Sequence, residues 1–374
     1  MIYFDNAATT KPSLTALNKA KVFNEDFFYN PSALYRCGLH CANAIKEAKN
    51  SILKTLGVSE NKYEVIFTSC GTESDNTAIF CATKRGTFVT DYGEHSAVIK
   101  CFNELKNQGR TVCFCGIDKN GKVNEDELLS LVNKVNAGFV SVMHVNNETG
   151  AIKDVNRLAA EIKKINPNII FHSDGVQAYG KIPFSLSENI DMYSVSAHKI
   201  NGLKGVGALI KRKKLNVSPL IYGGGQENGL RSGTENVFGI KVFQYAAEDH
   251  YSRLNENYEK VNTIKNYIKE NLDKKLFRII SGTDSSPYIL SVSAVGLRGE
   301  VLMHILEEKG FITGNGSACS SKNRFSRVIE SCGYKNDVLD GVLRLSFSAE
   351  NTIEEAKEFV FSANEAALTL KGIM

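Results

Sequence analysis

Short apolar segments alternate with longer amphipathic segments from about residue 60 to residue 210. The short segments are rich in β-branched and aromatic residues, which predicts strands at 64–68, 87–90, 111–114, 138–143, 169–171, 192–195 and 206–210. Helical periodicity between them predicts helices at 73–83, 95–106 and 124–135. This alternation favours an α/β fold with a mostly parallel central sheet and helices on both faces. Ligands of such sheets bind beyond the carboxyl ends of the strands.

The second part of the chain has a different order of elements. Residues 237–275 contain no proline and predict one long helix, followed by strands at 277–280, 288–292 and 342–347 and a helix at 299–309. A chain of 374 residues exceeds the size at which a single core usually stops growing. We therefore expect a large domain of residues 15–254 and a smaller α+β domain formed by residues 1–14 and 255–374.

Composition narrows the class of protein. Hydrophobic residues make up 43% and charged residues 23% of the chain, which is ordinary for a globular protein, and a net charge of +4 gives no reason to expect a nucleic-acid partner. No signal peptide or membrane-spanning segment is readable, so we expect a cytoplasmic protein without a membrane partner. The nine cysteines are expected to be reduced, and their spacing predicts no metal site.

Lys199 and Asp174 carry the most specific chemical signal. Lys199 follows an apolar segment in Ser196-Ala197-His198-Lys199, where burial disfavours a charged amine unless the amine is used. A desolvated lysine can form a Schiff base with a carbonyl compound. Pyridoxal 5'-phosphate needs a lysine for its aldehyde and a carboxylate for its ring nitrogen. The pair therefore predicts a pyridoxal phosphate site.

Other polar residues also follow predicted strands. Thr72 opens a helix after a glycine turn and is either a phosphate ligand or an ordinary helix cap. His95 is either a satisfied structural histidine or a group that stacks on the cofactor and moves protons. Asn147 could bind cofactor or substrate, although asparagine is also a common turn former. Gln177 could donate to the phenolic oxygen of the cofactor.

Three further features lie in the second half of the chain. The glycine-rich stretch 223–236 is either a flexible loop or a second anion clamp lent by a neighbouring subunit. Arg344 alternates into a strand, where it meets either a substrate carboxylate or a structural carboxylate. Cys319 is flanked by glycine and serine, which is typical of a reactive thiol on a loop and indicates that sulfur is carried.

Together these residues resemble the cysteine desulfurases of the nitrogen-fixation and iron–sulfur-assembly type, within the class V aminotransferase superfamily. The resemblance extends from Tyr3 to Arg344. Its most specific motifs are Thr72-Glu73-Ser74-Asp75-Asn76, His144-Val145-Asn146-Asn147-Glu148, Arg231-Ser232-Gly233-Thr234 and Gly316-Ser317-Ala318-Cys319.

The resemblance implies a fold-type-I homodimer that converts L-cysteine to L-alanine. It implies that Lys199 binds the cofactor covalently, that Asp174 pairs with the ring nitrogen, that His95 stacks on the ring and that Gln177 contacts its phenolate. The phosphate would be held by Thr72, Ser196, His198 and Thr234 of the other subunit. Asn147 and Arg344 would bind the substrate carboxylate. Cys319 would carry the sulfur as a persulfide to an acceptor protein for iron–sulfur cluster assembly, a thio-cofactor or tRNA thiolation.

The chain departs from the family pattern at several positions. Tyr35 follows the Asn30-Pro31-Ser32 turn where the family usually has a histidine, and Gly175 replaces the usual alanine, which predicts a slightly looser turn. A selenocysteine lyase or a class V transaminase would share the cofactor but depend less on Cys319. A non-catalytic partner-binding scaffold that retains pyridoxal phosphate is the alternative from a different class.

Overall fold

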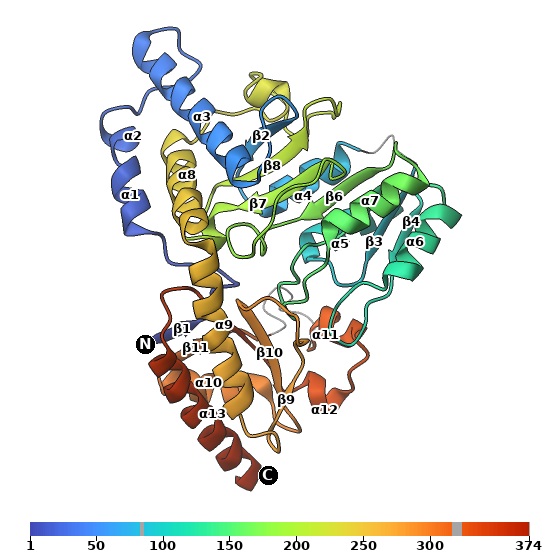
Figure 1. Ribbon diagram of the computed structural model, residues 1–374, viewed down its shortest axis with the longest axis vertical. Helices are drawn as coiled ribbons and strands as arrows, with labels where there is room; N and C mark the ends of the chain where they lie inside the picture. Colours follow the sequence, from blue (N-terminus) through green and yellow to red (C-terminus); the bar gives the residue numbers. More distant parts are fainter. Residues whose placement is uncertain (83–85, 316–323, 374) are drawn as a thin grey trace.

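The computed structural model describes residues 1–82, 86–315 and 324–373. Figure 1 shows a larger part, built on a central sheet, above a smaller part that contains both ends of the chain. The helices α8 (Val237–Ser252) and α9 (Leu254–Asn271) follow one another from the larger part into the smaller one. The polar strand ends of the large sheet face the region where the two parts meet.

Within the described residues the large sheet has seven strands. Their order across the sheet is β2 (Tyr63–Thr68), β8 (Gly207–Arg212), β7 (Met192–Ser196), β6 (Ile170–Asp174), β5 (Ala137–Ser141), β3 (Thr87–Asp91) and β4 (Val112–Cys115). The pairs from β7 to β4 are parallel, whereas β8 is antiparallel to both β2 and β7. The expected mostly parallel α/β sheet is therefore confirmed.

Successive residues of the strands face opposite sides of the sheet, and each side has its own helices. One side packs against α4 (Gly71–Phe80) and α5 (Ser96–Asn107), and its strand residues include Phe139, Ile170 and Met192. Their neighbours Val140, Phe171 and Tyr193 belong to the core on the other side. That core includes α3 (Arg36–Thr55), α6 (Glu125–Lys134), α7 (Val155–Ile165) and α8. Because both faces are buried, the strands are almost continuously apolar.

The smaller part combines the two ends of the chain. An antiparallel sheet in the order β12 (Val342–Ser346), β10 (Ile289–Ala294) and β9 (Phe277–Ile279) lies beside the parallel pair β1 (Ile2–Phe4) and β11 (Phe311–Thr313). Phe4 packs edge-on against Phe347 and Phe359 of the C-terminal region, with ring centroids 5.3 and 5.6 Å apart. The core of this part also includes α9, α10 (Gly299–Glu308) and α13 (Ile353–Ile373). The domain boundaries at residues 14/15 and 254/255 stay a prediction.

The single helix predicted over residues 237–275 is wrong in one respect. The backbone of Arg253 is not helical (φ −125°, ψ 22°), so the segment forms two helices, α8 and α9, although it contains no proline.

The remaining short elements are α1 (Leu14–Ala20), α2 (Val22–Glu25), α11 (Arg327–Ser331), α12 (Asn336–Leu339) and the 3₁₀ turns η1 (Ala197–Lys199) and η2 (Glu227–Gly229).

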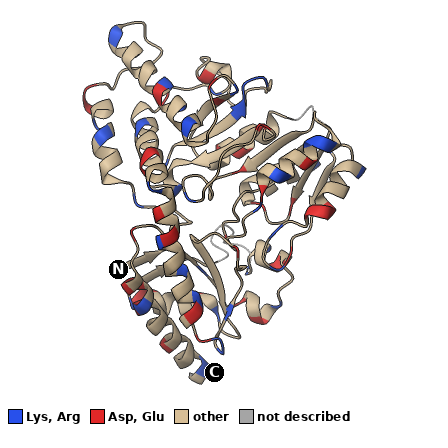
Figure 2. Cartoon of the chain, viewed as in Figure 1, with Lys and Arg blue, Asp and Glu red and all other residues tan. Residues whose placement is uncertain are grey.

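Charged residues of both signs alternate along the outer helices, and the strands of the large sheet are mostly uncharged (Figure 2). Among the residues that the structure describes, we find no helix with the length and apolar character needed to cross a membrane.

Candidate active site

A cavity of about 290 Å³ lies at the carboxyl ends of β6 and β7. We call it the Lys199 cavity. Of the residues that the sequence predicts for the site, it is lined by Thr72, His95, Asn147, Asp174, Gln177, Ser196, His198, Lys199 and Arg344. These residues come from both halves of the chain, so the fold gathers them at one place, as expected for the ends of parallel strands.

Lys199 ends the short turn η1 that directly follows β7. Its Nζ donates hydrogen bonds to the carbonyl oxygens of Ala7 and Ala8, at 2.7 and 2.8 Å. Both alanines also line the cavity. The N-terminal segment therefore helps to hold the amine at the cavity wall.

Asp174 is the last residue of β6 and is almost completely buried. Its Oδ1 accepts a hydrogen bond from the Val176 amide at 2.9 Å. Burial raises the pKa of Asp174 to about 6, against the opposing effects of the Val176 amide and the nearby Lys199. A cationic partner in the cavity would favour its ionised form.

The N-terminus of α4 forms a second wall of the cavity. Cys70 precedes this helix without a side-chain capping bond, so the first amides of α4 have no internal cap. A Cβ at Gly71 would lie 2.7 Å from Cγ2 of Val176 and 3.4 Å from Cβ of Ser196, so only glycine permits this close packing. The buried Oγ of Ser196 has no hydrogen-bond partner among the described residues. Helix amides and an unpartnered hydroxyl suit a phosphate group.

Two histidines at the cavity are uncharged. His95 precedes α5, and its Nδ1 accepts a hydrogen bond from the Ala97 amide at 3.2 Å, which leaves the proton on Nε2. Burial and the nearby Lys199 lower the pKa of His95 to about 4. Nδ1 of His198 lies 3.1 Å from Oγ1 of Thr9, and burial lowers the pKa of His198 to about 4. Both rings are therefore neutral near pH 7.

The amide of Gln177 has a fixed orientation. Its Nε2 donates to the carbonyl oxygen of Ala7 at 2.9 Å, and its Oε1 accepts from Nζ of Lys181 at 2.9 Å. Burial, with Lys199 and Arg344, lowers the pKa of Lys181 to about 7. Because an amide nitrogen has two protons, Gln177 retains a second donor for a ligand.

Arg344 and Asn147 lie together on the side of the smaller part. Arg344 donates from Nη2 to Oδ1 of Asp5 at 2.7 Å and from Nη1 to the carbonyl oxygen of Asn147 at 3.0 Å. A structural carboxylate is therefore present. Nε of Arg344 and Oδ1 of Asn147 are nevertheless buried without a hydrogen-bond partner among the described residues.

One predicted residue that the structure describes, Thr234, does not line this cavity. Thr234 lines a separate cavity of about 130 Å³ that also contains Glu227 and Arg231. The expectation that Thr234 acts at the site of the other subunit stays a prediction. Cys319 lies outside the described residues.

The polar atoms of the Lys199 cavity fit pyridoxal phosphate. An amine, a buried carboxyl group, an uncapped helix N-terminus and an unpartnered serine hydroxyl correspond to its aldehyde, ring nitrogen and phosphate. The described residues contain no group of three or more His, Cys, Asp or Glu side chains that could hold a metal ion. The expected lack of a metal stays a prediction.

Comparisons with known proteins identify the family. The model of the class-V aminotransferases matches residues 2–359. The cysteine desulfurase IscS of Methanosarcina thermophila is 36% identical over 363 residues, which are 95% of this chain and 89% of that protein. A solved NifS-like protein superposes with a TM-score of 0.92 at 34% identity and covers 99% of this chain and 100% of its own. The chain belongs to the cysteine desulfurase family.

A further solved structure shows SspA in complex with cysteine. It is 29% identical to this cysteine desulfurase, with a TM-score of 0.82, and covers 93% of this chain and 99% of its own. The expected family, fold and enzyme class are thus confirmed.

Sequence reasoning missed three features of this cysteine desulfurase. Cys70 and Asp75 line the Lys199 cavity, and Lys181 orients Gln177 from outside it. Asp75 belongs to the motif Thr72-Glu73-Ser74-Asp75-Asn76, but sequence spacing alone does not show that its carboxyl group lies at the same cavity as that of Asp174. Lys181 follows Gln177 by four residues in a hydrogen-bonded turn after β6, a spacing that can bring two side chains together.

The expectation of a looser turn at Gly175 is wrong. A Cβ at Gly175 would lie 1.9 Å from Cζ of Tyr193, so the ring of Tyr193 fills the space. The hydroxyl of Tyr193 lies 2.9 Å from Nδ1 of His144. The missing methyl group is therefore replaced by a neighbouring side chain, and the turn after Asp174 stays closely packed.

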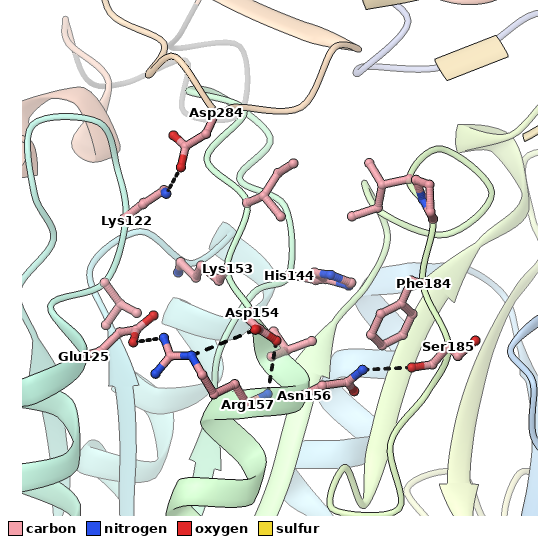
Figure 3. A pocket seen from close by; sticks show the side chains of 15 residues that line it. Lys122, Glu125, His144, Lys153, Asp154, Asn156, Arg157, Phe184, Ser185 and Asp284 are labelled. Atoms are coloured by element: carbon pink, nitrogen blue, oxygen red, sulfur yellow. Dashed lines mark hydrogen bonds and ion pairs between the residues drawn. The ribbon is translucent and has the colours of Figure 1, made fainter. Parts of the chain in front are cut away.

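A second cavity of about 610 Å³ is lined in part by His144 (Figure 3). We call it the His144 cavity. Its charged side chains are paired: Lys122 with Asp284, Arg157 with Glu125 and Asp154, and Lys153 with Asp91. The Lys122–Asp284 pair links the larger part of the molecule to the smaller one.

Proposed function

We propose that this chain is a homodimeric, pyridoxal phosphate-dependent desulfurase that converts L-cysteine to L-alanine and passes the sulfur on from Cys319. One observation carries the proposal. In the described residues, the cavity that contains Lys199 and Asp174 also contains the buried, unpartnered atoms Ser196 Oγ, Asn147 Oδ1 and Arg344 Nε. Such groups are costly unless a ligand completes their hydrogen bonds.

The residues of the cavity would hold the cofactor at three points. Lys199 would bind its aldehyde, Asp174 its ring nitrogen, and Ser196 with the first amides of α4 its phosphate. Thr72 and His198 would lie at the phosphate end, and His95 would lie over the ring. Bound pyridoxal phosphate supplies an electron sink that weakens the bond between Cα of the substrate and its proton.

The substrate carboxylate would bind between Arg344 and Asn147. The ion pair with Asp5 fixes the guanidinium group in advance, so little side-chain entropy is lost on binding. Once its amine is released, Lys199 stands at the cavity and can move the Cα proton. The neutral His95 lines the same cavity and can exchange a proton with the substrate.

Sulfur transfer requires a thiolate. Cys319, as a thiolate, would attack the sulfur of the substrate and form a sulfur–sulfur bond. The carbon–sulfur bond of the substrate breaks, and its electron pair stays on carbon, which is protonated on the way to alanine. The persulfide on Cys319 then passes to an acceptor protein for iron–sulfur cluster assembly, a thio-cofactor or tRNA thiolation.

A homodimer and a cytoplasmic location complete the proposal. Thr234 does not line the Lys199 cavity of its own chain. This is what we expect of a residue that acts at the cavity of the partner subunit. Large apolar side chains such as Leu34 and Tyr222 are strongly exposed and suit a contact between subunits. A thiol that cycles through a persulfide needs a compartment that keeps thiols reduced, as the cytoplasm does.

The test uses the native chain and the variants Cys319→Ala and Cys319→Ser. With L-cysteine, the native chain should release alanine and form a persulfide, measured by alanine assay and by mass increase on thiol labelling. Both variants should retain the visible absorption of the cofactor and lose the persulfide. Persistent alanine and sulfide release from the variants would indicate a lyase in which Cys319 is dispensable.

A further inference from the structure

Asp75 is a buried carboxyl group that the roles above do not use. It lies in the first turns of α4, lines the Lys199 cavity and is 1% exposed. Its Oδ1 has no hydrogen-bond partner among the described residues, and Nε2 of His172 lies 3.6 Å away. Asp91, which is 0% exposed, instead has a lysine partner, Lys153, at 2.6 Å.

His172 cannot neutralise a negative charge on Asp75. Its Nδ1 lies 3.0 Å from Oγ of Ser141, and its Nε2 lies 2.9 Å from Oγ of Ser194. Complete burial lowers the pKa of His172 to about 3, so the ring is neutral. It can exchange hydrogen bonds with its neighbours but supplies no charge.

The other titratable groups around Asp75 also supply no positive charge. The groups that face it from the neighbouring elements are Asp174, Glu94, Cys70, Cys101 and His172. In the described part of the chain, Asp75 forms no ion pair with a lysine or arginine. Two carboxylates in one buried site repel each other, and each loses its hydration. One of the two therefore has to keep a proton.

We propose that Asp75 is a positioning residue that keeps its proton, so that Asp174 alone carries the negative charge that holds the ring nitrogen of the cofactor. This inference rests on the proposed function. Burial and the charge of Asp174 raise the pKa of Asp75 well above its ordinary value. Asp174 has lysines nearby, Lys199 and Lys153, that favour its ionised form. An uncharged Asp75 can donate a hydrogen bond, and Asp174 is then the ionised member of the two.

The first test compares Asp75→Asn with Asp91→Asn in the full chain after removal of the cofactor. An amide is the nearest match to an uncharged carboxyl group, so Asp75→Asn should keep the native melting temperature at pH 5. A raised pKa means that the folded chain binds more protons than the unfolded chain above about pH 4. Asp75 therefore contributes a loss of stability from pH 5 to pH 8, and the melting temperature of Asp75→Asn should rise increasingly above that of the native chain over this range.

Asp91→Asn is the matched control, because it leaves Lys153 buried without its carboxylate. It should melt below the native chain at both pH values. If Asp75→Asn behaves like Asp91→Asn, or fails to fold, Asp75 is ionised in the native chain and the proposal is wrong. This readout needs no catalysis, so it stands even if the proposed desulfurase activity is not found.

A second readout uses the chain with its cofactor. Asp75→Asn should keep the pH midpoint of the visible cofactor band and retain turnover, because charge and hydrogen bonding are preserved. Asp75→Ala should shift the midpoint and lower turnover, since it opens the packing beside Asp174. A midpoint that moves in Asp75→Asn as far as in Asp75→Ala would contradict the proposal. A chain that binds no cofactor would instead refute the proposed function.

Discussion

The two cavities differ in size and in how their polar groups are satisfied. The His144 cavity is about 610 Å³ and the Lys199 cavity about 290 Å³. Among the described residues, the lining of the larger cavity has its charges in ion pairs and no buried polar atom without a partner. The smaller cavity has four such atoms, on Asp75, Asn147, Ser196 and Arg344. Unpartnered atoms, more than volume, therefore indicate where a ligand belongs.

The physical reason is the cost of these atoms. A buried polar group without a hydrogen bond costs about 1–3 kcal/mol, and a chain that keeps several of them close together gains nothing unless a ligand completes them. Paired groups already contribute their energy to the fold. Substitutions in the two cavities should accordingly separate loss of function from loss of stability.

The largest effect on function is expected for Lys199→Ala. Loss of proton transfer alone should lower turnover by about 10²- to 10⁴-fold, and the visible band of the covalently bound cofactor should disappear. The melting temperature of the cofactor-free chain should change little, because the loss of its hydrogen bonds to the carbonyl oxygens of Ala7 and Ala8 is offset by the removal of a partly buried charge. Absorption spectra, alanine release and thermal unfolding measure the three quantities. A large loss of stability would show that Lys199 is structural.

The counterpart in the His144 cavity is Lys153→Met. It leaves Asp91 buried without its partner and should destabilise the fold by about 3–5 kcal/mol, measured by denaturant unfolding. The visible band of bound cofactor should remain, because Lys199 and Asp174 are unchanged. The double variant Asp91→Asn with Lys153→Met should recover most of the stability, because neither charge then remains. If the double variant does not recover the stability, the ion pair stabilises the fold by more than the cost of burying its two charges.

Arg344→Lys tests the substrate side of the Lys199 cavity. Lysine keeps the charge but loses the planar fork, so it cannot replace both the hydrogen bond from Nη1 to Asn147 and the donor that Nε would offer to the substrate. We expect kcat/KM for L-cysteine to fall by the equivalent of about 1.5–3 kcal/mol, with a raised KM. Cofactor absorption serves as the control. An unchanged KM would show that Arg344 has a structural role, through its ion pair with Asp5, and does not bind the substrate.

The pH dependence of cofactor binding tests Asp174. Its pKa is raised to about 6, so its proton is retained below that pH and the carboxylate forms as the pH rises through it. Affinity for pyridoxal phosphate should therefore increase by up to about tenfold per pH unit from pH 5 to pH 6 and level off above. Asp174→Asn should bind weakly and lose the part of this dependence that comes from the protein. His95 and His198, with pKa values of about 4, do not titrate in this range.

Much of the lining of the Lys199 cavity could be predicted because its residues directly follow strands. Asp174 and Lys199 lie at and after the ends of β6 and β7, and parallel strands bring such positions together. Residues that act through tertiary contacts could not be found in this way. Tyr193 replaces the missing methyl group of Gly175 from the neighbouring strand, and β11 was missed because its three residues are stabilised by pairing with β1. Neither relationship has a local pattern.

The smallest effect is expected for Lys122→Ala at the rim of the His144 cavity. Lys122 pairs with Asp284 across the two parts of the molecule, but both side chains are substantially exposed. Exposed ion pairs contribute about 0.2–1 kcal/mol and are screened by salt. Stability should fall within that range at low ionic strength and be unchanged in high salt, while kcat/KM stays native. A clear loss of turnover would show that closure between the two parts depends on this pair, and that the His144 cavity takes part in catalysis after all.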